Sequence, residues 1–438
     1  MLKKLFLLAL LLNFNCALPT AQTATAVSPE AAVGANKNAL LRQQSFEKVW
    51  TTVNEKHFDA TFGGVDWKKM REIYEPKALA AQTDAEFYGV LQKMLDELGQ
   101  SHFNVVPPQA ALDTEKTGAT KDAGIGIELT MIDGKPVVRR VRAGSPAAKS
   151  DLKTGFVVEK IGGKTVAEIL VPVDKALAVR RETEGQKQFT RARVLERNLE
   201  GKPGTTVALE VSDEKNQPRQ FSVLRETAKT EYSPAMGNFP PQAIEFETRR
   251  LEKGVGYIRF NIWVLPQLAK IREALKTMAD APGVIFDLRG NPGGIGGLAP
   301  GIGGNLFTEQ TSLGTMTFRA SEQKFIAYPQ SDVFRGKVAV LTDGGSASTS
   351  EVFAAGLQET GRARIVGETT MGAILVSLFD RLPTGAIFQY AISDYKSPKK
   401  ILIEGRGVKP DVEVKLTRES LLAGRDLQLE AAVREALK

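Results

Sequence analysis

The chain has 438 residues, of which 42% are hydrophobic and 25% charged, and its formal net charge is +7 at pH 7. This length predicts about three domains, and the apolar fraction suffices for folded cores, so we expect a globular protein. The charge is mild, and the densest basic stretch, residues 175–197, is interleaved with glutamates as in a solvated helical face. Nucleic acid is therefore not an expected partner.

The first 26 residues have the features of a secretory signal peptide. Lys3 and Lys4 precede an apolar run over residues 5–12, and small residues follow. This run is too short to span a bilayer, so we expect residues 1–26 to be removed from an exported protein, periplasmic or secreted. Removal lowers the net charge from +7 to +5, because two lysines leave and no acid does.

Cys16 is the only cysteine, and it lies inside the signal region. The chain therefore cannot form an internal disulfide. A lipid on Cys16 would attach the protein to a membrane, but Asn15 is bulky and polar where a small residue is usual before a lipidated cysteine. We therefore expect an exported protein without this anchor.

An N-terminal helical region is predicted over residues 27–117. Residues 27–38 are small and polar and are typical of a linker, and three apolar patterns with helical spacing follow, over residues 40–57, 67–74 and 84–98. Gly99 is expected to end the last helix, because glycine commonly follows a helix C-terminus. His102 then lies in the segment after that helix.

The chain has two histidines, and their settings differ. His57 follows Val53 by four residues on an apolar helical stripe, which predicts a packing or helix-end role. His102 lies in a loop held by a helix, a setting that suits proton transfer. An imidazole with an ordinary pKa of about 6.5 can accept a proton and return it to a leaving group. His102 is therefore the candidate general base.

Short strands replace helices after a boundary rich in Pro, Thr and Lys over residues 107–123. Strand patterns begin at Gly124 and continue to a predicted hairpin over residues 207–224, which defines a β-rich domain over residues 118–228. From about residue 245 strands and helices alternate, which predicts a mixed α/β domain over residues 229–438 with active loops at the strand ends.

The segment VAVLTDGGSASTSEVFAAGLQ, residues 338–358, places a serine at a strand-to-helix turn. Gly344 and Gly345 permit a sharp turn, and Ser348 lies where the helix begins. Free N–H groups and the helix dipole there can stabilise the anion that forms when a hydroxyl attacks an acyl carbon. The alternative is that the serines only cap the helix, with Glu351 in the first turn. This segment alone leaves both interpretations open.

The sequence GGSASTSE resembles the S-A-S-A-S-E signature of the tail-specific, or C-terminal processing, serine peptidases, in which the middle serine is the nucleophile. Ser348 matches that serine. Residues 283–297, GVIFDLRGNPGGIGG, resemble the family's strand and glycine loop, residues 124–170 its PDZ domain and residues 401–412 its closing segment. The resemblance implies an α+β multidomain fold: an N-terminal helical bundle, a PDZ-like β-rich domain, and a mixed α/β catalytic domain of the crotonase-like or ClpP-like type.

One departure from the family pattern bears on the mechanism. Many members carry a lysine in a T-F-G-K-G segment, whereas this chain reads TTMGAIL with Ala373 at that position. A Ser/Lys dyad is therefore unsupported, and the chain is more similar to the tricorn-core branch, which uses serine, histidine and glutamate. Ser101 and His102 resemble that branch's serine–histidine pair, and Glu404 matches its glutamate, which would fix the imidazole tautomer and stabilise the imidazolium.

Two glycine-containing segments are candidate binding elements. The N–H groups of Gly293 and Gly294 are expected to form an oxyanion hole together with that of Thr349. The alternative is a tight turn that merely requires glycine. Asp287, Arg289 and Asn291 are expected to hold this loop in shape.

In the PDZ-like region, the segment GIGI matches the loop that holds a peptide's terminal carboxylate; it comprises Gly124, Ile125, Gly126 and Ile127. A strand edge beside a helix can add a peptide as an extra strand. The alternative is a strand-rich spacer without a ligand.

These patterns together predict an exported serine endopeptidase that hydrolyses peptides or unfolded proteins through an acyl-enzyme at Ser348, with no metal and no nucleotide cofactor. The PDZ-like domain would recruit peptide C-termini. The alternative, from another class, is a catalytically inactive PDZ-containing peptide-binding protein, for which Ala373 is the best support.

Overall fold

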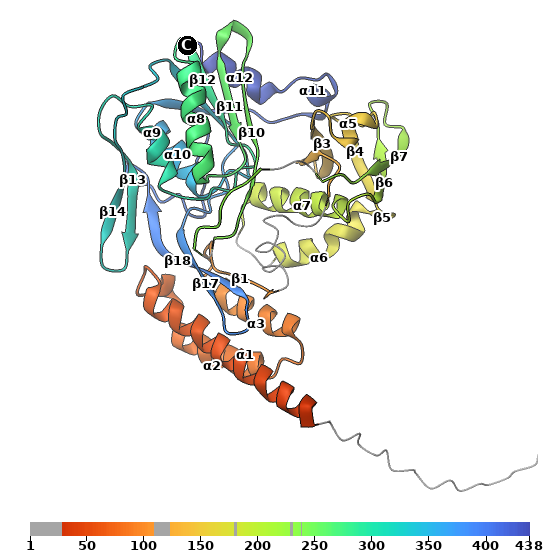
Figure 1. Ribbon diagram of the computed structural model, residues 1–438, viewed down its shortest axis with the longest axis vertical. Coiled ribbons are helices and arrows are strands. Elements are labelled where there is room, and N and C mark those ends of the chain that lie inside the picture. Colours follow the sequence, from red (N-terminus) through yellow and green to blue (C-terminus); the bar gives the residue numbers. More distant parts are fainter. Residues whose placement is uncertain (1–28, 109–122, 179–181, 228–230, 238) are drawn as a thin grey trace, which may run out of the picture.

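The computed structural model describes residues 29–108, 123–178, 182–227, 231–237 and 239–438, without the side chains of residues 29–37 and 176. The predicted signal peptide with Cys16 and most of the predicted boundary over residues 107–123 lie outside these ranges. Figure 1 shows a helical region at one end, a body of sheets and helices, and a smaller group of strands and helices beside that body. No helix in the described ranges is long and apolar enough to cross a membrane.

Three helices form the N-terminal region: α1 (Pro29–Lys56), α2 (Trp67–Leu79) and α3 (Asp84–Asp96). Helix α1 begins within the stretch that the sequence predicted to be a linker, residues 27–38, so that prediction was wrong. Thr83 and Glu86 form a capping box that starts α3. Phe46 and Phe87 are fully buried in a cluster that also contains Phe388, so the helices pack on the body of the protein.

The smaller group of strands and helices, which we call the middle domain, has a sheet of order β2-β3-β4-β6-β7 with β5 beside β4. Strand β2 is therefore an edge strand. The predicted hairpin is β6–β7, and it extends this sheet. The elements are β2 (Ile127–Ile132), β3 (Lys135–Val141), α5 (Pro146–Lys149), β4 (Val157–Ile161), β5 (Lys164–Thr165), α6 (Val166–Ala178), α7 (Glu184–Leu199), β6 (Thr206–Ser212) and β7 (Pro218–Leu224).

The body contains a six-stranded sheet of order β10-β11-β12-β15-β16-β19, parallel from β11 onward. A parallel sheet covered on both faces needs strands that are apolar throughout, and the runs at residues 283–287 and 337–342 meet this need. The strands are β10 (Phe246–Arg250), β11 (Gly256–Phe260), β12 (Gly283–Asp287), β15 (Lys337–Thr342), β16 (Ala363–Gly367) and β19 (Val412–Glu413), with a small pair β8 (Glu231–Tyr232) and β9 (Ala243–Ile244) before them.

Alternate side chains of these strands point to opposite faces of the sheet, as the two-residue strand period requires. Phe286 and Val340 lie in a core with α8 (Leu265–Thr277), α9 (Leu298–Gly303) and α10 (Thr349–Glu359). Ile285 and Leu341 lie in a second core with α12 (Leu427–Glu435). A short helix, α11 (Arg418–Leu422), lies next to the middle domain (Figure 1).

A second sheet of the body, of order β1-β18-β13-β14 with β17 beside β18, joins the N-terminal region to the body. Its strands are β1 (Asn104–Val106), β13 (Thr311–Phe318), β14 (Glu322–Ala327), β17 (Val376–Arg381) and β18 (Ile387–Lys396). Strand β1 pairs antiparallel with β18, with Asn104 opposite Gln389. This pairing carries the segment just before β1, which contains His102, to the body.

Candidate active site

Ser348 lies at a strained turn between β15 and α10. Its φ of 53° and ψ of −117° are rarely adopted by residues other than glycine, and such strain is typical of a nucleophile presented at a strand-to-helix turn. Asp343 supports the turn, because its Oδ1 accepts hydrogen bonds from the N–H groups of Gly290 (2.8 Å) and Gly345 (2.9 Å). The turn therefore holds both the segment before Ser348 and the glycine loop after β12.

The three serines of the motif have different surroundings. Ser346 is fully buried and donates its hydroxyl to Leu288 O at 2.8 Å. Ser350 is fully buried, donates to Asn291 O at 3.0 Å and accepts from the Trp263 indole at 2.9 Å. Ser348 is half-buried. The two outer serines therefore connect the turn to the core, and the middle one is the least buried of the three.

His102, Ser101 and Glu404 form one hydrogen-bonded chain. Ser101 Oγ lies 2.7 Å from His102 Nδ1 and donates to Glu404 Oε2 at 3.0 Å. Glu404 Oε1 also accepts from the Ser101 N–H at 2.8 Å. Two segments about 300 residues apart in the sequence therefore meet here, and His102 itself has a left-handed φ of 63°.

The direction of these bonds fixes the tautomer of the histidine. A serine hydroxyl has one proton, and Ser101 donates it to the carboxylate. Ser101 Oγ must then accept a hydrogen bond from the Nδ1–H of His102, which leaves the Nε2 of His102 as the basic nitrogen. Glu404 was expected to fix the tautomer directly, and the structure places the Ser101 hydroxyl between the two groups.

Burial affects the pKa values of both groups. It lowers the pKa of His102 to about 4, because the charged imidazolium loses its hydration. It also raises the pKa of Glu404, against the effect of the N–H groups of Ile374 and Ser101, which donate to it. His102 is therefore neutral, and able to accept a proton, throughout the neutral pH range.

Consecutive residues of one loop contact both Ser348 and the Glu404 carboxylate that supports His102. Ala373 O accepts from the Ser348 N–H at 2.8 Å, and the Ile374 N–H donates to Glu404 Oε2 at 2.9 Å. Among the described residues, no hydrogen bond joins Ser348 Oγ to His102. Ala373, at the position of the family lysine, thus contributes backbone atoms to the site.

The glycine loop after β12 touches the nucleophile. A Cβ on Gly293 would lie 2.6 Å from Ser348 Cβ, and both Gly293 and Gly294 have positive φ. The Gly293 N–H already donates to Asn291 Oδ1 at 3.0 Å. The N–H of Thr349 is the first amide of α10, where no acceptor within the helix is available. Of the three expected oxyanion donors, Gly293 is therefore the one that is engaged.

A buried ion pair lies at the start of the glycine loop that follows β12. Asp287 is fully buried, forms an ion pair with Arg289 at 2.7 Å and accepts from the Tyr257 hydroxyl at 2.8 Å. Arg289 also contacts Asp426 at 2.8 Å. Burial alone would raise the pKa of Asp287, but Arg289 lowers it well below its usual range. These contacts agree with the shaping role expected for these residues.

The contacts of His57 are those of a packed side chain. Its side chain is fully buried and stacks on Phe58 and Phe103 at centroid distances of 4.6 and 5.5 Å. Its Nε2 bonds Gln100 Oε1 at 2.9 Å, and its Nδ1 accepts from the Asp59 N–H at 3.0 Å. The packing role predicted for His57 agrees with these contacts.

In the middle domain, the expected carboxylate loop precedes edge strand β2. Ile125 O accepts from Ala147 N at 2.9 Å, and Gly126 O accepts from Arg142 N at 2.8 Å, so these carbonyls are already paired. The edge of β2 is also engaged, because the Leu129 N–H donates to Glu196 Oε1 of helix α7 at 2.7 Å. A peptide that adds to β2 would have to displace this carboxylate.

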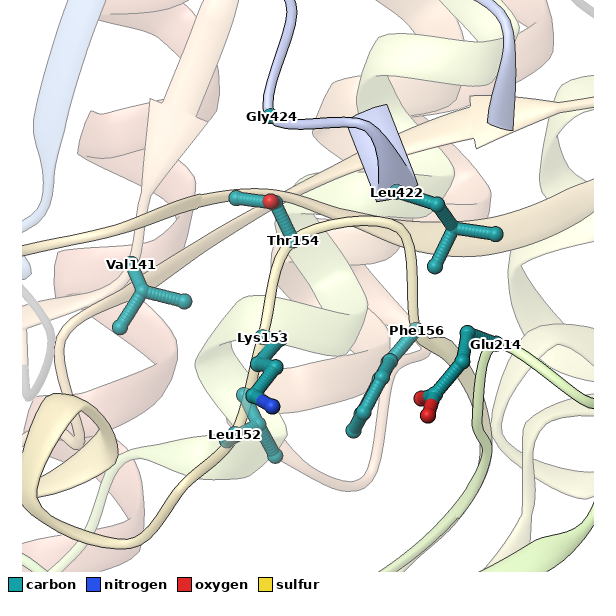
Figure 2. Close-up of a pocket in the computed structure, with 8 residues that line it drawn as sticks. All are labelled: Val141, Leu152, Lys153, Thr154, Phe156, Glu214, Leu422 and Gly424. Carbon is teal, nitrogen blue, oxygen red and sulfur yellow. The ribbon is translucent and has the colours of Figure 1, made fainter. Parts of the chain in front are cut away.

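A cavity of about 410 Å³ lies elsewhere in the middle domain (Figure 2). It opens between the β3–β4 side and the C-terminal segment around α11, and the GIGI loop does not line it. The side chains around it include an acid, a base and several apolar groups: Val141, Leu152, Lys153, Thr154, Phe156, Glu214, Leu422 and Gly424.

Sequence reasoning missed an ionic connection between the middle domain and the nucleophile turn. Arg139 of β3 contacts Glu128 at 2.8 Å and Asp343 at 2.9 Å, and Arg259 contacts Glu128 at 3.0 Å. Burial alone would raise the pKa of Glu128, but Arg139, Arg259 and Arg140 lower it well below its usual range. Glu128, Arg139 and Arg259 lie on separate strands, so their spacing in the sequence does not predict this connection.

Sequence reasoning also took Glu351 only as a first-turn residue of the helix. Its carboxylate is fully buried and accepts from four donors around the nucleophile. Glutamate is almost never fully buried without such partners. Its place directly after a serine-rich turn was the available signal.

Comparisons with known proteins show relatives among the peptidases. The model of peptidase family S41 matches residues 254–414, and that of the tricorn protease C1 domain matches residues 40–96. A carboxyl-terminal-processing protease of Synechocystis sp. is 26% identical over 392 residues, which cover 88% of this chain and 84% of the relative. The carboxy-terminal processing protease CtpA of Bacillus subtilis is 22% identical, covering 82% and 71%.

Solved structures show that the fold is shared. A photosystem II D1 C-terminal processing protease aligns with a TM-score of 0.58 and 22% identity, covering 91% of this chain and 97% of that one. Mature CPAF complexed with lactacystin aligns with a TM-score of 0.57 and 13% identity, covering 91% and 98%. Residues 254–414 therefore match peptidase family S41, and the chain is a serine-type peptidase that is similar to carboxyl-terminal processing proteases.

Proposed function

We propose that this protein is an exported endopeptidase that cleaves peptides or unfolded proteins through an acyl-enzyme on Ser348. The observation that carries this proposal is the contrast among the serines: Ser346 and Ser350 are buried in structural hydrogen bonds, and Ser348 is half-buried at a strained turn. A strained, accessible hydroxyl at a helix N-terminus is the arrangement that acyl transfer requires.

In the proposed reaction, Ser348 Oγ attacks the peptide carbonyl while His102 Nε2 takes the hydroxyl proton. The tetrahedral intermediate then expels the amine, which receives that proton from His102, and water hydrolyses the ester by the same route. The Ser101 hydroxyl holds the imidazole through Nδ1, and Glu404 stabilises the imidazolium through Ser101. This is a Ser–His–Glu mechanism, and the alanine at position 373 is compatible with it.

The oxyanion would be stabilised by the N–H groups of Gly294 and Thr349. Gly293 allows the loop to approach Ser348, because any side chain there would collide with the nucleophile. Its own N–H is engaged by Asn291 and would have to be released before it could serve as a third donor.

The middle domain is proposed to be a PDZ-like module that recruits peptide C-termini by strand addition to β2. Its support is the position of β2 at the edge of its sheet next to α7. The N-terminal part of α7 contacts the proposed catalytic loops: Gln186 donates to Met371 O, and Gly185 lies against Gly344. We also propose that residues 1–26 are removed and that the mature chain has three domains, over residues 27–117, 118–228 and 229–438.

Hydrolysis of an unstructured polypeptide tests the proposal. We expect the purified chain to release fragments with internal cleavage sites, without added metal or nucleotide, and Ala373→Lys not to raise the rate. A folded protein that binds C-terminal peptides but cleaves none of a panel of unstructured substrates would favour the binding-protein alternative.

A further inference from the structure

Glu351 is a second buried carboxylate, which contacts the backbone of Ser348, and the mechanism above does not use it. Glu351 Oε2 accepts from the N–H groups of Ser348 and Ala373, each at 3.0 Å. Its Oε1 accepts from the Gly372 N–H at 2.6 Å and from the Thr370 hydroxyl at 2.5 Å. All four partners are donors, so the ionised carboxylate is the form that fits, and a protonated one would lose a contact.

The loop that donates to Glu351 also donates to the other buried carboxylate of the site. Ala373 N–H points to Glu351, and the next amide, that of Ile374, points to Glu404. Ala373 O accepts from the Ser348 N–H at 2.8 Å. Consecutive residues of one loop therefore fix the nucleophile on one side and the support of the base on the other.

We propose that the loop of residues 370–374, held between the carboxylates of Glu351 and Glu404, sets the position of Ser348 relative to His102, with Glu351 as a positioning residue. This inference rests on the function proposed above. The loop would position the two groups through its backbone N–H and C=O groups. A displacement of about 1 Å between reacting groups can lower a rate by about 10²-fold, so the loop's position matters for catalysis.

The charges around Glu351 are few. Helix α10 packs on α9, β13 and β16, and the charged side chain of those three elements, Arg364, pairs with Asp411 and Glu435. Tyr395 is the titratable neighbour, and its pKa is raised by burial first and by Glu359 and Glu351 after that. Burial raises the pKa of Glu351 to about 7, against the four donors. Its charge therefore changes near neutral pH.

The first test compares two glutamates on the same helix. Glu351→Gln places amide hydrogens against donors, so the loop must shift, and we expect kcat to fall about 10²-fold with KM within twofold of wild type. Glu359→Gln is the matched control, because Glu359 ends α10 and accepts from Ser397 and Lys399 outside the site. Circular dichroism and thermal melting check that both variants fold.

The second test separates positioning from general packing. Thr370→Val removes one donor to Glu351 and should move the upper acid limb of the kcat profile from near pH 7 to higher pH by about one unit. Thr370→Ser keeps the hydroxyl and should leave that limb in place. This pair carries the test if Glu351→Gln does not fold.

Three results would overturn the inference: a wild-type kcat in Glu351→Gln, an equal loss in Glu359→Gln, or an acid limb that Thr370→Val does not move. Failure of the proposed function is distinguishable from these. In that case the wild-type chain itself would hydrolyse nothing, and a fluorophosphonate would not label Ser348 in any variant.

Discussion

The proposed nucleophile, Ser348, and the proposed base, His102, differ in how far away in the sequence their supporting residues lie. Ser348 is held by residues of its own strand–turn–helix segment, by the glycine loop after β12, and by residues 370–374. His102 is held by Ser101, its neighbour, and through it by Glu404, which lies 303 residues from Ser101 in the chain. The supports of Ser348 therefore come from nearer parts of the chain, and the support of His102 depends on a contact across most of its length.

The largest expected effect separates Ser348 from its neighbours. Ser348→Ala should lower the rate of peptide hydrolysis by about 10³–10⁶-fold with little effect on stability, because its hydroxyl is the proposed nucleophile. Ser350→Ala should keep the rate within about tenfold and lower the free energy of unfolding by about 1–3 kcal/mol, since it leaves the buried Trp263 indole unpaired. Kinetics and urea unfolding measure both, and a more severe rate loss in Ser350→Ala would reverse the assignment.

Catalysis should depend on Glu404, although Glu404 reaches His102 only through the Ser101 hydroxyl. Glu404→Gln should slow hydrolysis by about 10²–10⁴-fold, because this carboxylate accepts from three donors, and at least one of them would face the amide hydrogens of glutamine. Single-turnover kinetics with a peptide ester separates acylation from product release. Rates equal to wild type in a folded Glu404→Gln variant would remove the charge of Glu404 from the mechanism.

Much of this comparison could be made from the sequence. The strand, turn and helix around Ser348 follow from a short apolar run, two glycines and helical spacing, all within residues 338–358. The pairing of Ser101 and His102 with Glu404 came only from a family resemblance, because nothing in residue spacing shows that β1 pairs with β18. The role of Ser101 as the bridge, and the four donors on Glu351, depend on tertiary geometry that no local pattern carries.

The pH dependence sharpens the comparison further. His102 has a pKa lowered to about 4 by burial, so it stays neutral as the pH falls through the ordinary histidine range. Protonation of His102 should therefore lower the acylation rate only below about pH 4, with a tenfold fall per pH unit. The fall in rate near pH 7 is the one that we assign to Glu351. Pre-steady-state acylation by the Glu351→Gln variant, which lacks the Glu351 carboxylate, measures the effect of His102 protonation at each pH, and a loss of rate centred near pH 6.5 in that variant would contradict the lowered pKa of His102.

The smallest expected effect concerns peptide capture by the middle domain. In a Ser348→Ala background, Glu196→Ala should tighten binding of a peptide with a free C-terminus by about fivefold, because the Leu129 N–H becomes available to it. Glu184→Ala, on the exposed first turn of the same helix, is the control. Calorimetry with the free acid and the C-terminal amide decides, and unchanged affinity would show that Glu196 does not occupy the peptide's place.

Labelling with a fluorophosphonate, followed by mass-spectrometric mapping of the modified peptide, tests the pairing of Ser348 with His102 most directly. Wild type and His57→Ala should be labelled at Ser348, and His102→Ala should be labelled at least about 10²-fold more slowly, because His102 Nε2 is the proposed base. Undiminished labelling of a folded His102→Ala variant, or label on Ser346 or Ser350 instead of Ser348, would contradict this assignment.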